Sequence, residues 1–350
     1  MNLSPLAWAL ALPEPMLRRI AGPPVVRDGA TLDTQLQALL WLASKAPITP
    51  PESMAPQAAR TLMRSSVRML GEPRIPLASV VDRAVPGPAG DVPVRVYAPI
   101  GGAGSKPLIV FFHGGGWVLG DLETHDGIPR RLARDVDAVV VAVDYRLAPE
   151  HPFPAAADDA LAAYRWALSN AAALGADGSR VAVVGDSAGG NLAAVVANET
   201  RRAGERAPDL QVLIYPVTDL ATEHGSYETF ANGFQLDRAL MRWFIQHYVG
   251  DADPADPRAS PLHAPSLDGV APALVLTSGF DVLRDEGVAY VARLQAAGVA
   301  VEHHHHPSLI HGFFSMAAIC READRTFARA VGVMRARLGA GRGDGRPAAG

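Results

Sequence analysis

The sequence predicts an α/β fold with a mostly parallel central sheet of about eight strands, helices on both faces and a helical cap. From about Val80 onward, short apolar runs alternate with longer amphipathic ones, which is typical of strands connected by helices. One short run, Ala138–Val143, is apolar throughout and rich in β-branched residues, as in strands buried on both faces. A glycine-rich turn at 185–190 joins another short run to an amphipathic stretch, as expected of a strand–turn–helix unit.

Taken in order, the runs define the expected elements of the sheet. We expect strands at Val92–Tyr97, Leu108–Phe112, Ala138–Val143, Arg180–Val184, Leu210–Tyr215, Ala273–Thr277 and Val299–His304. We expect helices within Leu122–Asp135 and at Ala155–Ala173, Ala188–Arg202, Arg238–Tyr248, Glu286–Ala297 and Glu322–Leu338. The α/β domain therefore spans residues 81–338.

The first 80 residues read as a helical cap packed on that domain. One helix begins at Leu32, with Thr31 expected to cap it and Pro47 just beyond its end, and a second covers about Ala58–Leu70. The irregular stretch 217–272 is expected to add to the cap. Residues 339–350 contain mostly Gly, Arg, Pro and Ala, which predicts a disordered tail.

Composition gives no reason to expect a nucleic-acid partner, a disulfide bond or a membrane span. Of the 350 residues, 49% are apolar, and the net charge of −4 gives no electrostatic reason to expect nucleic acid as a partner. A single cysteine, Cys320, allows no intrachain disulfide and is expected to be a packed thiol. The apolar run Leu6–Leu12 is too short to span a bilayer and lacks a preceding basic residue, so we expect no integral membrane association and a cytoplasmic location.

Ser187 is the candidate nucleophile. It is the centre of Gly185-Asp186-Ser187-Ala188-Gly189, a Gly-x-Ser-x-Gly turn between a predicted strand and helix. Such a turn is so tight that side chains at the flanking positions would clash, and it raises the hydroxyl above the sheet edge. The alternative, a phosphate-binding loop, is disfavoured because no Lys follows the glycines.

A second glycine loop supplies candidate oxyanion donors. His113-Gly114-Gly115-Gly116 follows the predicted strand Leu108–Phe112. Acyl transfer needs hydrogen-bond donors aimed at the oxygen that becomes negative, and glycines let a backbone approach the substrate. We therefore expect the N–H groups of Gly115, Gly116 and Ala188 to form an oxyanion hole. His113 lies upstream of the nucleophile, so we expect it to anchor the glycine loop instead of acting as the base.

The base and the acid are expected after later strands. His311 follows the last strand, and Asp281 follows Ala273–Thr277, which places both at the sheet edge that carries Ser187. Asp285 is a rival acid, but it falls in the first turn of the next helix, where a carboxylate stabilises the helix N-terminus.

A run of four histidines, His303–His306, invites interpretation as a metal site. Alternate side chains of a strand point to opposite faces, so at most two of the four converge. No cluster of Cys or carboxylates accompanies them at ligand spacing. We therefore expect a strand end with partly exposed imidazoles and no metal.

Four motifs taken together resemble one known family. His113–Gly116, Tyr145–Ala155, Gly185–Gly189 and His311–Phe313 look like those of the bacterial hormone-sensitive-lipase group (family IV) of carboxylesterases, which have the α/β-hydrolase fold. The resemblance runs from about residue 85 to 335, and the N-terminal helices also look like that family's cap. The family usually has proline after the acid, where this chain has Val282, which loosens the loop but leaves the carboxylate in place.

The resemblance implies a cofactor-independent serine esterase acting on small-molecule esters with short acyl chains. It implies Ser187, Asp281 and His311 as the triad, with the oxyanion hole at Gly115, Gly116 and Ala188. We expect four side chains to line the substrate pocket: Trp117, Asp186, Tyr215 and Phe234.

The sequence leaves alternatives open for the class of protein, the type of bond cleaved and the oligomeric state. A binding module on the same scaffold would lack a working triad, and a burst of alcohol from an activated ester would distinguish it from an enzyme. Cleavage of amides, lactones or carbamates would use the same groups. Finally, Val299–His304 should be an edge strand, and because edges invite pairing, a homodimer through it is plausible.

Overall fold

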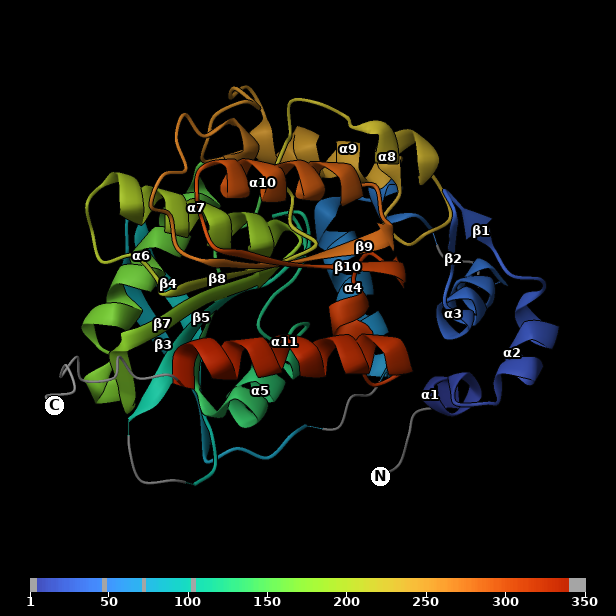
Figure 1. The fold of residues 1–350 in the computed structure, drawn as a ribbon, viewed down its shortest axis with the longest axis horizontal. Coiled ribbons are helices and arrows are strands. Elements are labelled where there is room, and N and C mark those ends of the chain that lie inside the picture. Colours follow the sequence, from blue (N-terminus) through green and yellow to red (C-terminus); the bar gives the residue numbers. More distant parts are fainter. Residues whose placement is uncertain (1–4, 46–48, 71–73, 102–104, 340–350) are drawn as a thin grey trace, which may run out of the picture.

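The computed structural model describes residues 5–45, 49–70, 74–101 and 105–339 (Figure 1). In this part of the chain, eight strands form one sheet in the order β10-β9-β8-β7-β5-β6-β4-β3. Their bounds are β3 Ser79–Gly87, β4 Gly90–Ala98, β5 Lys106–Phe112, β6 Val139–Val143, β7 Ala176–Asp186, β8 Leu210–Ile214, β9 Ala273–Phe280 and β10 Val301–Ile310. The α/β fold with about eight strands is confirmed.

The sheet is parallel from β10 to β6, and β4 and β3 add to it in antiparallel fashion. β5 is apolar from Leu108 to Phe112, and all five residues of β6 are apolar and buried. The seven predicted strands correspond to β4–β10, and β3 was not predicted. Most β3 side chains are exposed, and Asp82 and Arg83 interrupt its apolar residues, so it lacks the pattern of a buried strand.

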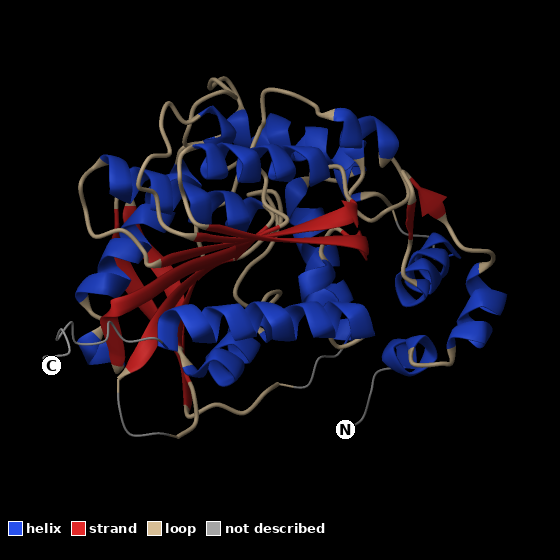
Figure 2. Ribbon diagram, viewed as in Figure 1, coloured by secondary structure: helices blue, strands red, loops and turns tan. Residues whose placement is uncertain are grey.

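Helices cover both faces of the sheet (Figure 2). On one face lie α6 (Ala155–Ser169), α7 (Ala188–Arg202) and α10 (Arg284–Ala296). On the other lie α5 (Gly127–Leu132) and α11 (Arg321–Gly339), which lie side by side below the sheet in Figure 1. Short 3-10 or π turns lie at Pro51–Ser53, Ala133–Asp137, Ala172–Leu174, Pro261–His263 and Phe313–Met316.

Most of the N-terminal segment, up to residue 45, lies beyond the carboxyl ends of β9 and β10, whereas its last helix overlaps these strands in the view (Figure 1). It contains α1 (Pro5–Leu10), α2 (Glu14–Ala21), the two-stranded sheet β1 (Val26–Arg27) with β2 (Ala30–Thr31), α3 (Thr34–Lys45) and α4 (Pro56–Leu70). Contacts tie it to the end of the chain: the Asp33 N–H donates to Ser308 O at 2.9 Å, and the Gln35 amide reaches Ile319 O and Arg321 N.

The cap of α3 differs from the prediction. Thr31 belongs to β2, and the Asp33 carboxylate accepts hydrogen bonds from the N–H groups of Gln35 at 2.8 Å and Leu36 at 3.1 Å. Aspartate is as good an N-cap as threonine, so the spacing alone did not distinguish them. Within 217–272, the structure forms α8 (Gly225–Thr229) and α9 (Arg238–Val249).

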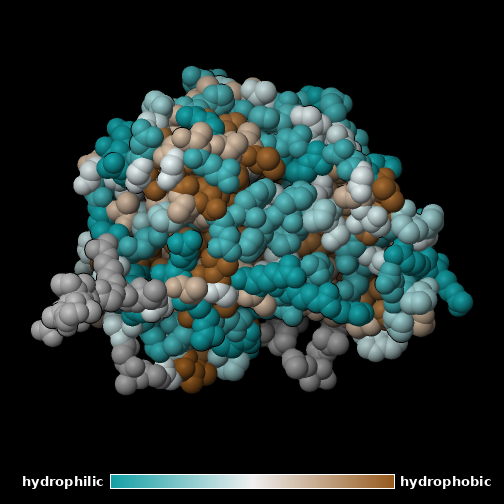
Figure 3. Space-filling model, in the orientation of Figure 1, coloured by the Kyte–Doolittle hydropathy of each residue, from teal (hydrophilic) through white to brown (hydrophobic). Residues whose placement is uncertain are grey.

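The visible face of the molecule is largely hydrophilic over α11 (Figure 3). Among the residues that the structure describes, every helix is too short or too polar to cross a lipid bilayer. The predicted disordered tail began at Gly339, but Gly339 is the last residue of α11, and positions 340–350 lie outside the described residues.

Candidate active site

The loops after β5 and β7 start side by side at one edge of the sheet. Phe112 at the end of β5 pairs with Gly185 in β7, while β6 lies on the other side of β5. The connection after β5 leads to β6 on one side, and the connection after β7 leads to β8 on the other side. In open α/β sheets, ligands bind beyond the carboxyl ends of the strands at the point where the connections diverge in this way. The two glycine-rich motifs lie at the carboxyl ends of these two strands, β5 and β7.

The turn from β7 into α7 presents Ser187. The backbone there has φ +57°, which a non-glycine residue rarely adopts, and the Ser187 N–H donates to Ile214 O at 2.8 Å. A Cβ added at Gly185 would lie 2.1 Å from Gly189 O, as the tight turn predicts. At Gly189 the obstacle is different: an added Cβ would lie 2.0 Å from Phe112 O, a neighbour from β5.

The second glycine loop closes against α9. Gly116 has φ +60°, and a Cβ there would lie 2.1 Å from the Phe244 ring of α9. Within the described part of the chain, the N–H groups of Gly115 and Gly116 donate no hydrogen bond to another protein group. They are therefore available to a ligand. The sequence did not predict the Phe244 contact, because Gly116 and Phe244 are far apart in the chain and no local pattern links them.

His113 supports the loop from below, as the sequence predicts. Its Nδ1 lies 2.7 Å from Gly114 O, its ring stacks on Tyr145 at 4.3 Å between centroids, and the Tyr145 hydroxyl donates to His113 O. Burial lowers the pKa of His113 to about 4, so the imidazole is neutral at pH 7 and Nδ1–H is the donor.

Asp186 lies between the two loops. Its Oδ1 accepts a hydrogen bond from the Gly114 N–H at 3.0 Å, so one buried carboxylate joins the residue before the nucleophile to the glycine loop. Burial raises the pKa of Asp186 to about 6. Asp186, which the sequence predicts to line the pocket, therefore holds the glycine loop beside Ser187.

The predicted acid, Asp281, and the predicted base, His311, each follow one of two residues that are paired across β9 and β10. Phe280 of β9 pairs with Ile310 of β10, and Asp281 and His311 are the next residues on the two strands. Nδ1 of His311 lies 2.8 Å from Oδ2 of Asp281, and its Nε2 lies 2.9 Å from Oγ of Ser187. The structure therefore brings the three predicted triad residues together in one line of contacts.

The rival acid, Asp285, lies elsewhere. It is in the first turn of α10, where its carboxylate accepts from the Ser226 N–H at 2.8 Å and pairs with Arg284. No contact joins Asp285 to His311 among the described residues. Its position is the helix-terminal one that the sequence suggests.

The other predicted pocket residues surround the triad and the glycine loop. Tyr215 lies against the base, with its ring centroid 4.5 Å from that of His311. Phe234 packs on Phe280, the residue before the acid, at 5.2 Å. Trp117 is fully buried and stacks on Tyr248 of α9 at 4.0 Å, so its ring supports the loop and presents no surface to a substrate in this structure.

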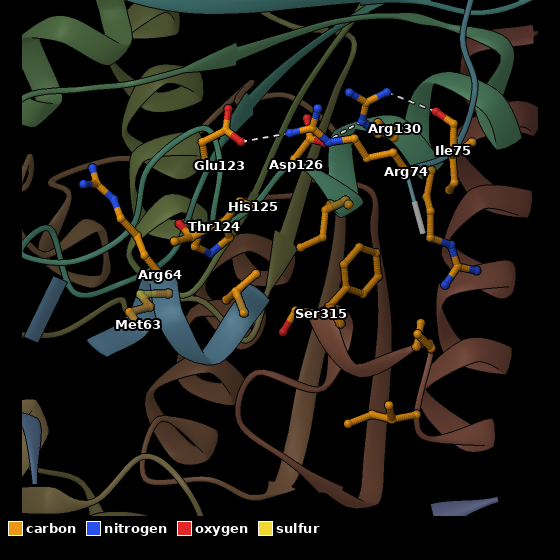
Figure 4. A pocket seen from close by; sticks show the side chains of 18 residues that line it. Met63, Arg64, Arg74, Ile75, Glu123, Thr124, His125, Asp126, Arg130 and Ser315 are labelled. Carbon is orange, nitrogen blue, oxygen red and sulfur yellow. Dashed lines mark hydrogen bonds and ion pairs between the residues drawn. The ribbon is translucent and has the colours of Figure 1, made fainter. Parts of the chain in front are cut away.

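A separate cavity of about 510 Å³ lies between α4, the segment 123–131 and the turn after His311 (Figure 4). None of the triad or predicted pocket residues lines it. Its four arginines are already paired: Arg64 with Asp121, Arg74 with Glu123, Arg130 with Asp126 and Arg131 with Asp324. Because these guanidinium groups are in ion pairs, their positive charge gives no reason to expect an anionic ligand in the cavity.

The four histidines behave as strand alternation requires. His303 and His305 both contact the Thr277 hydroxyl, at 2.9 and 3.0 Å, whereas His304 contacts Glu302. Across the described residues, no group of three or more His, Cys, Asp or Glu side chains is arranged to hold a metal ion.

Comparisons with known proteins agree with this geometry. Residues 109–315 match the family described as alpha/beta hydrolase fold. The chain is 47% identical to the carboxylic ester hydrolase LipN of Mycobacterium tuberculosis over 323 residues, which are 89% of this chain and 84% of LipN. It is 43% identical to an ethyl acetate hydrolase of Pseudomonas putida, over 71% of this chain and 79% of that protein.

Solved structures give the same result. The chain is similar to the ester hydrolase EH1AB1 from the metagenome of Lake Arreo, solved with a derivative of bipyridine phosphonate. The TM-score is 0.85 at 42% identity, covering 88% of this chain and 99% of that one. A thermostable esterase from Pseudomonas putida has a TM-score of 0.82 at 37% identity, over 88% and 98% of the two chains.

Proposed function

The chain belongs to the alpha/beta-hydrolase fold family and is a carboxylic-ester hydrolase, and we propose that it cleaves short- to medium-chain acyl esters through an acyl-enzyme on Ser187. The observation that carries the mechanism is the line of contacts from Asp281 through His311 to Ser187, at 2.8 and 2.9 Å. Such a line is the arrangement by which a base activates a serine hydroxyl and an acid orients the base.

In the proposed first step, Oγ of Ser187 attacks the ester carbonyl carbon while its proton passes to Nε2 of His311. The carbonyl oxygen becomes negative and accepts hydrogen bonds from the N–H groups of Gly115, Gly116 and Ala188. The bond to the alcohol oxygen then breaks, and the alcohol leaves with the proton from His311.

In the second step, water gives a proton to His311 as its oxygen attacks the acyl carbon. The bond to Ser187 breaks, the carboxylic acid is released, and the proton returns to Ser187. The Asp281 carboxylate orients the imidazole and stabilises the imidazolium that forms in each step. No cofactor takes part in this scheme.

We further propose that residues 1–80 and 217–272 form the cap over this site. Two contacts support the cap: Phe244 of α9 lies against Gly116, and Gln35 of α3 reaches the segment 319–321. A covered site has limited room for an acyl chain, so octanoate and shorter esters should be preferred.

Two measurements test the proposed function. Ser187→Ala should abolish hydrolysis of p-nitrophenyl butyrate without changing the circular dichroism spectrum, and retained hydrolysis would show that Ser187 is not the nucleophile. A series of p-nitrophenyl esters from acetate to palmitate should peak at octanoate or below. Peak activity on dodecanoate or a longer ester would contradict the short-chain assignment.

A homodimer through the β10 edge also stays a proposal. β10 is at one edge of the sheet, but its Ser308 carbonyl is occupied by the Asp33 N–H, so pairing would use Val301–His306. Size-exclusion chromatography with light scattering should give twice the monomer mass. A proline in place of His304 should then return the monomer, whereas a monomeric parent chain would exclude the dimer.

A further inference from the structure

The turn that carries Asp281 is held by a buried serine from α8. The Ser226 hydroxyl donates to Val282 O at 2.5 Å, and it accepts from the Asp285 N–H at 3.3 Å. The Ser226 N–H donates to the Asp285 carboxylate at 2.8 Å. Three hydrogen bonds from one buried residue therefore fix the segment that immediately follows the candidate acid.

The Asp281 carboxylate depends on the same segment. Its Oδ1 accepts from the Leu283 N–H at 2.9 Å, and its Oδ2 faces His311. Leu283 N–H and Val282 C=O belong to a single peptide group, which is planar. Ser226 therefore holds one end of the peptide plane whose other end holds Asp281, and rotation of that plane would disturb both contacts together.

The turn formed by residues 281–284 does not by itself fix the orientation of the Val282–Leu283 peptide plane. The Arg284 N–H donates to Asp281 O at 3.2 Å, and Leu283 has φ −86° and ψ 0°, which is the geometry of a type I turn with Val282 in its second position. Proline is favoured there because its ring fixes φ. Valine lacks that constraint, so the plane depends on its hydrogen bonds, which are the one from Ser226 to Val282 O and the one from Leu283 N–H to Asp281 Oδ1.

We propose that Ser226 is a positioning residue for catalysis, which orients the Val282–Leu283 peptide so that Leu283 N–H keeps the Asp281 carboxylate facing His311. The inference rests on the proposed function, in which Asp281 is the acid. Ser226 itself touches neither the nucleophile nor the base. It acts through the peptide plane and contributes nothing to substrate binding.

Ser226→Ala should lower kcat about 10- to 100-fold with little change in KM, as expected when a catalytic group is misplaced by a fraction of an ångström. It should also move the acidic limb of the kcat/KM profile to lower pH, because a poorly placed Asp281 stabilises the His311 imidazolium less. Asp186, the other buried carboxylate that acts electrostatically on His311, is unchanged in this variant.

Ser260→Ala is a matched control, which distinguishes loss of the positioning role from a general loss of stability. Ser260 is also buried, donates to Pro254 O at 2.7 Å and accepts from the Leu220 N–H at 2.7 Å, but it lies outside the turn at 281–284. Ser260→Ala should lower the melting temperature and leave kcat and the pH profile as they are. If Ser226→Ala behaves like Ser260→Ala, the inference is wrong.

Rescue gives the strongest test. Val282→Pro fixes φ at the second position of the turn, so Ser226→Ala/Val282→Pro should recover most of the lost kcat and the parent pH profile. Failure to recover either one would overturn the role assigned to the peptide plane. If Ser226→Ala does not fold, Ser226→Cys serves in its place, because a thiol fills the space but is a weak donor.

Asp281→Asn distinguishes this inference from the function on which it rests. If Asp281→Asn keeps its activity, Asp281 is not the acid and both proposals fail. If Asp281→Asn is inactive and Ser226→Ala matches the Ser260 control, only the positioning role fails.

Discussion

The carboxylate of Asp281 lies 2.8 Å from Nδ1 of His311, and its side chain has no exposed surface. In the proposed mechanism, this carboxylate selects the imidazole tautomer with the proton on Nδ1, which leaves Nε2 free to accept the proton of Ser187. The contact depends on register: the strand residues that precede the two side chains, Phe280 and Ile310, are paired across β9 and β10.

Asp281→Asn should therefore lower kcat by roughly four orders of magnitude, because the amide favours the wrong tautomer. The matched comparison is Asp285→Asn, four residues on, where an amide oxygen still accepts from the Ser226 N–H and the loss should stay below about tenfold. Steady-state kinetics on p-nitrophenyl butyrate measures both. An equal loss in the two variants would contradict the choice of Asp281 as acid.

Gly116→Ala should lower kcat by about 10²- to 10³-fold, because the new methyl group collides with Phe244 and displaces an oxyanion donor. Gly204→Ala is the matched control. Gly204 has φ +69°, close to the +60° of Gly116, but no atom lies within 4 Å of its added Cβ. It should show the strain of a left-handed alanine as a lower melting temperature, with kcat unchanged. Equal kcat values would exclude the collision as the cause.

The candidate triad residues could be predicted because each follows a strand and has a local signature. Register then brings Asp281 and His311 together without further information. Contacts between distant segments were not predictable in this way. The Gly189 obstacle is the Phe112 carbonyl, and Trp117 stacks on Tyr248, although no local pattern links the members of either pair.

The errors at the periphery have a similar cause. Most side chains of β3 are exposed, so its residues show no buried face, and pairing with β4 defines the strand. Thr31 and Asp33 are both good capping residues two positions apart. The choice between them depends on the pairing of β1 with β2, which places Thr31 in a strand.

His113→Asn should alter the pH dependence of stability. Burial lowers the pKa of His113 to about 4 from an ordinary value of 6.5, so the unfolded chain takes up a proton in this range before the folded chain does. The stability contributed by the neutral imidazole is present above pH 6.5 and is lost progressively as the pH falls toward 4. Asparagine retains a side-chain N–H near Nδ1 but does not titrate.

The destabilisation caused by His113→Asn should therefore be about 2 kcal/mol smaller at pH 5.0 than at pH 7.5. Urea titrations of the parent and the variant at the two pH values give this difference, and contributions from titrating groups that do not interact with His113 are shared by both chains. A destabilisation that stays constant between pH 7.5 and 5.0 would show that His113 does not resist protonation in the folded state.

Gln35→Leu should loosen the N-terminal segment from the α/β domain. The buried Gln35 amide donates to Leu10 O at 2.8 Å and Ile319 O at 3.3 Å, and accepts from the Arg321 N–H at 2.9 Å. Leucine leaves these backbone groups without that partner, at a cost of about 2 kcal/mol in the free energy of unfolding. Gln57→Leu, which removes an exposed contact with Glu150, should cost less than about 0.5 kcal/mol.

If the N-terminal segment covers the site, its loosening should also change substrate preference. The ratio of kcat/KM for p-nitrophenyl dodecanoate to that for the butyrate should rise in Gln35→Leu, because a longer acyl chain needs the space that the segment occupies. Gln57→Leu should keep the parent ratio. A lower melting temperature with an unchanged ratio would mean that the segment contributes to stability alone, and the acyl-chain limit would then have to come from α9 and the residues around Phe244.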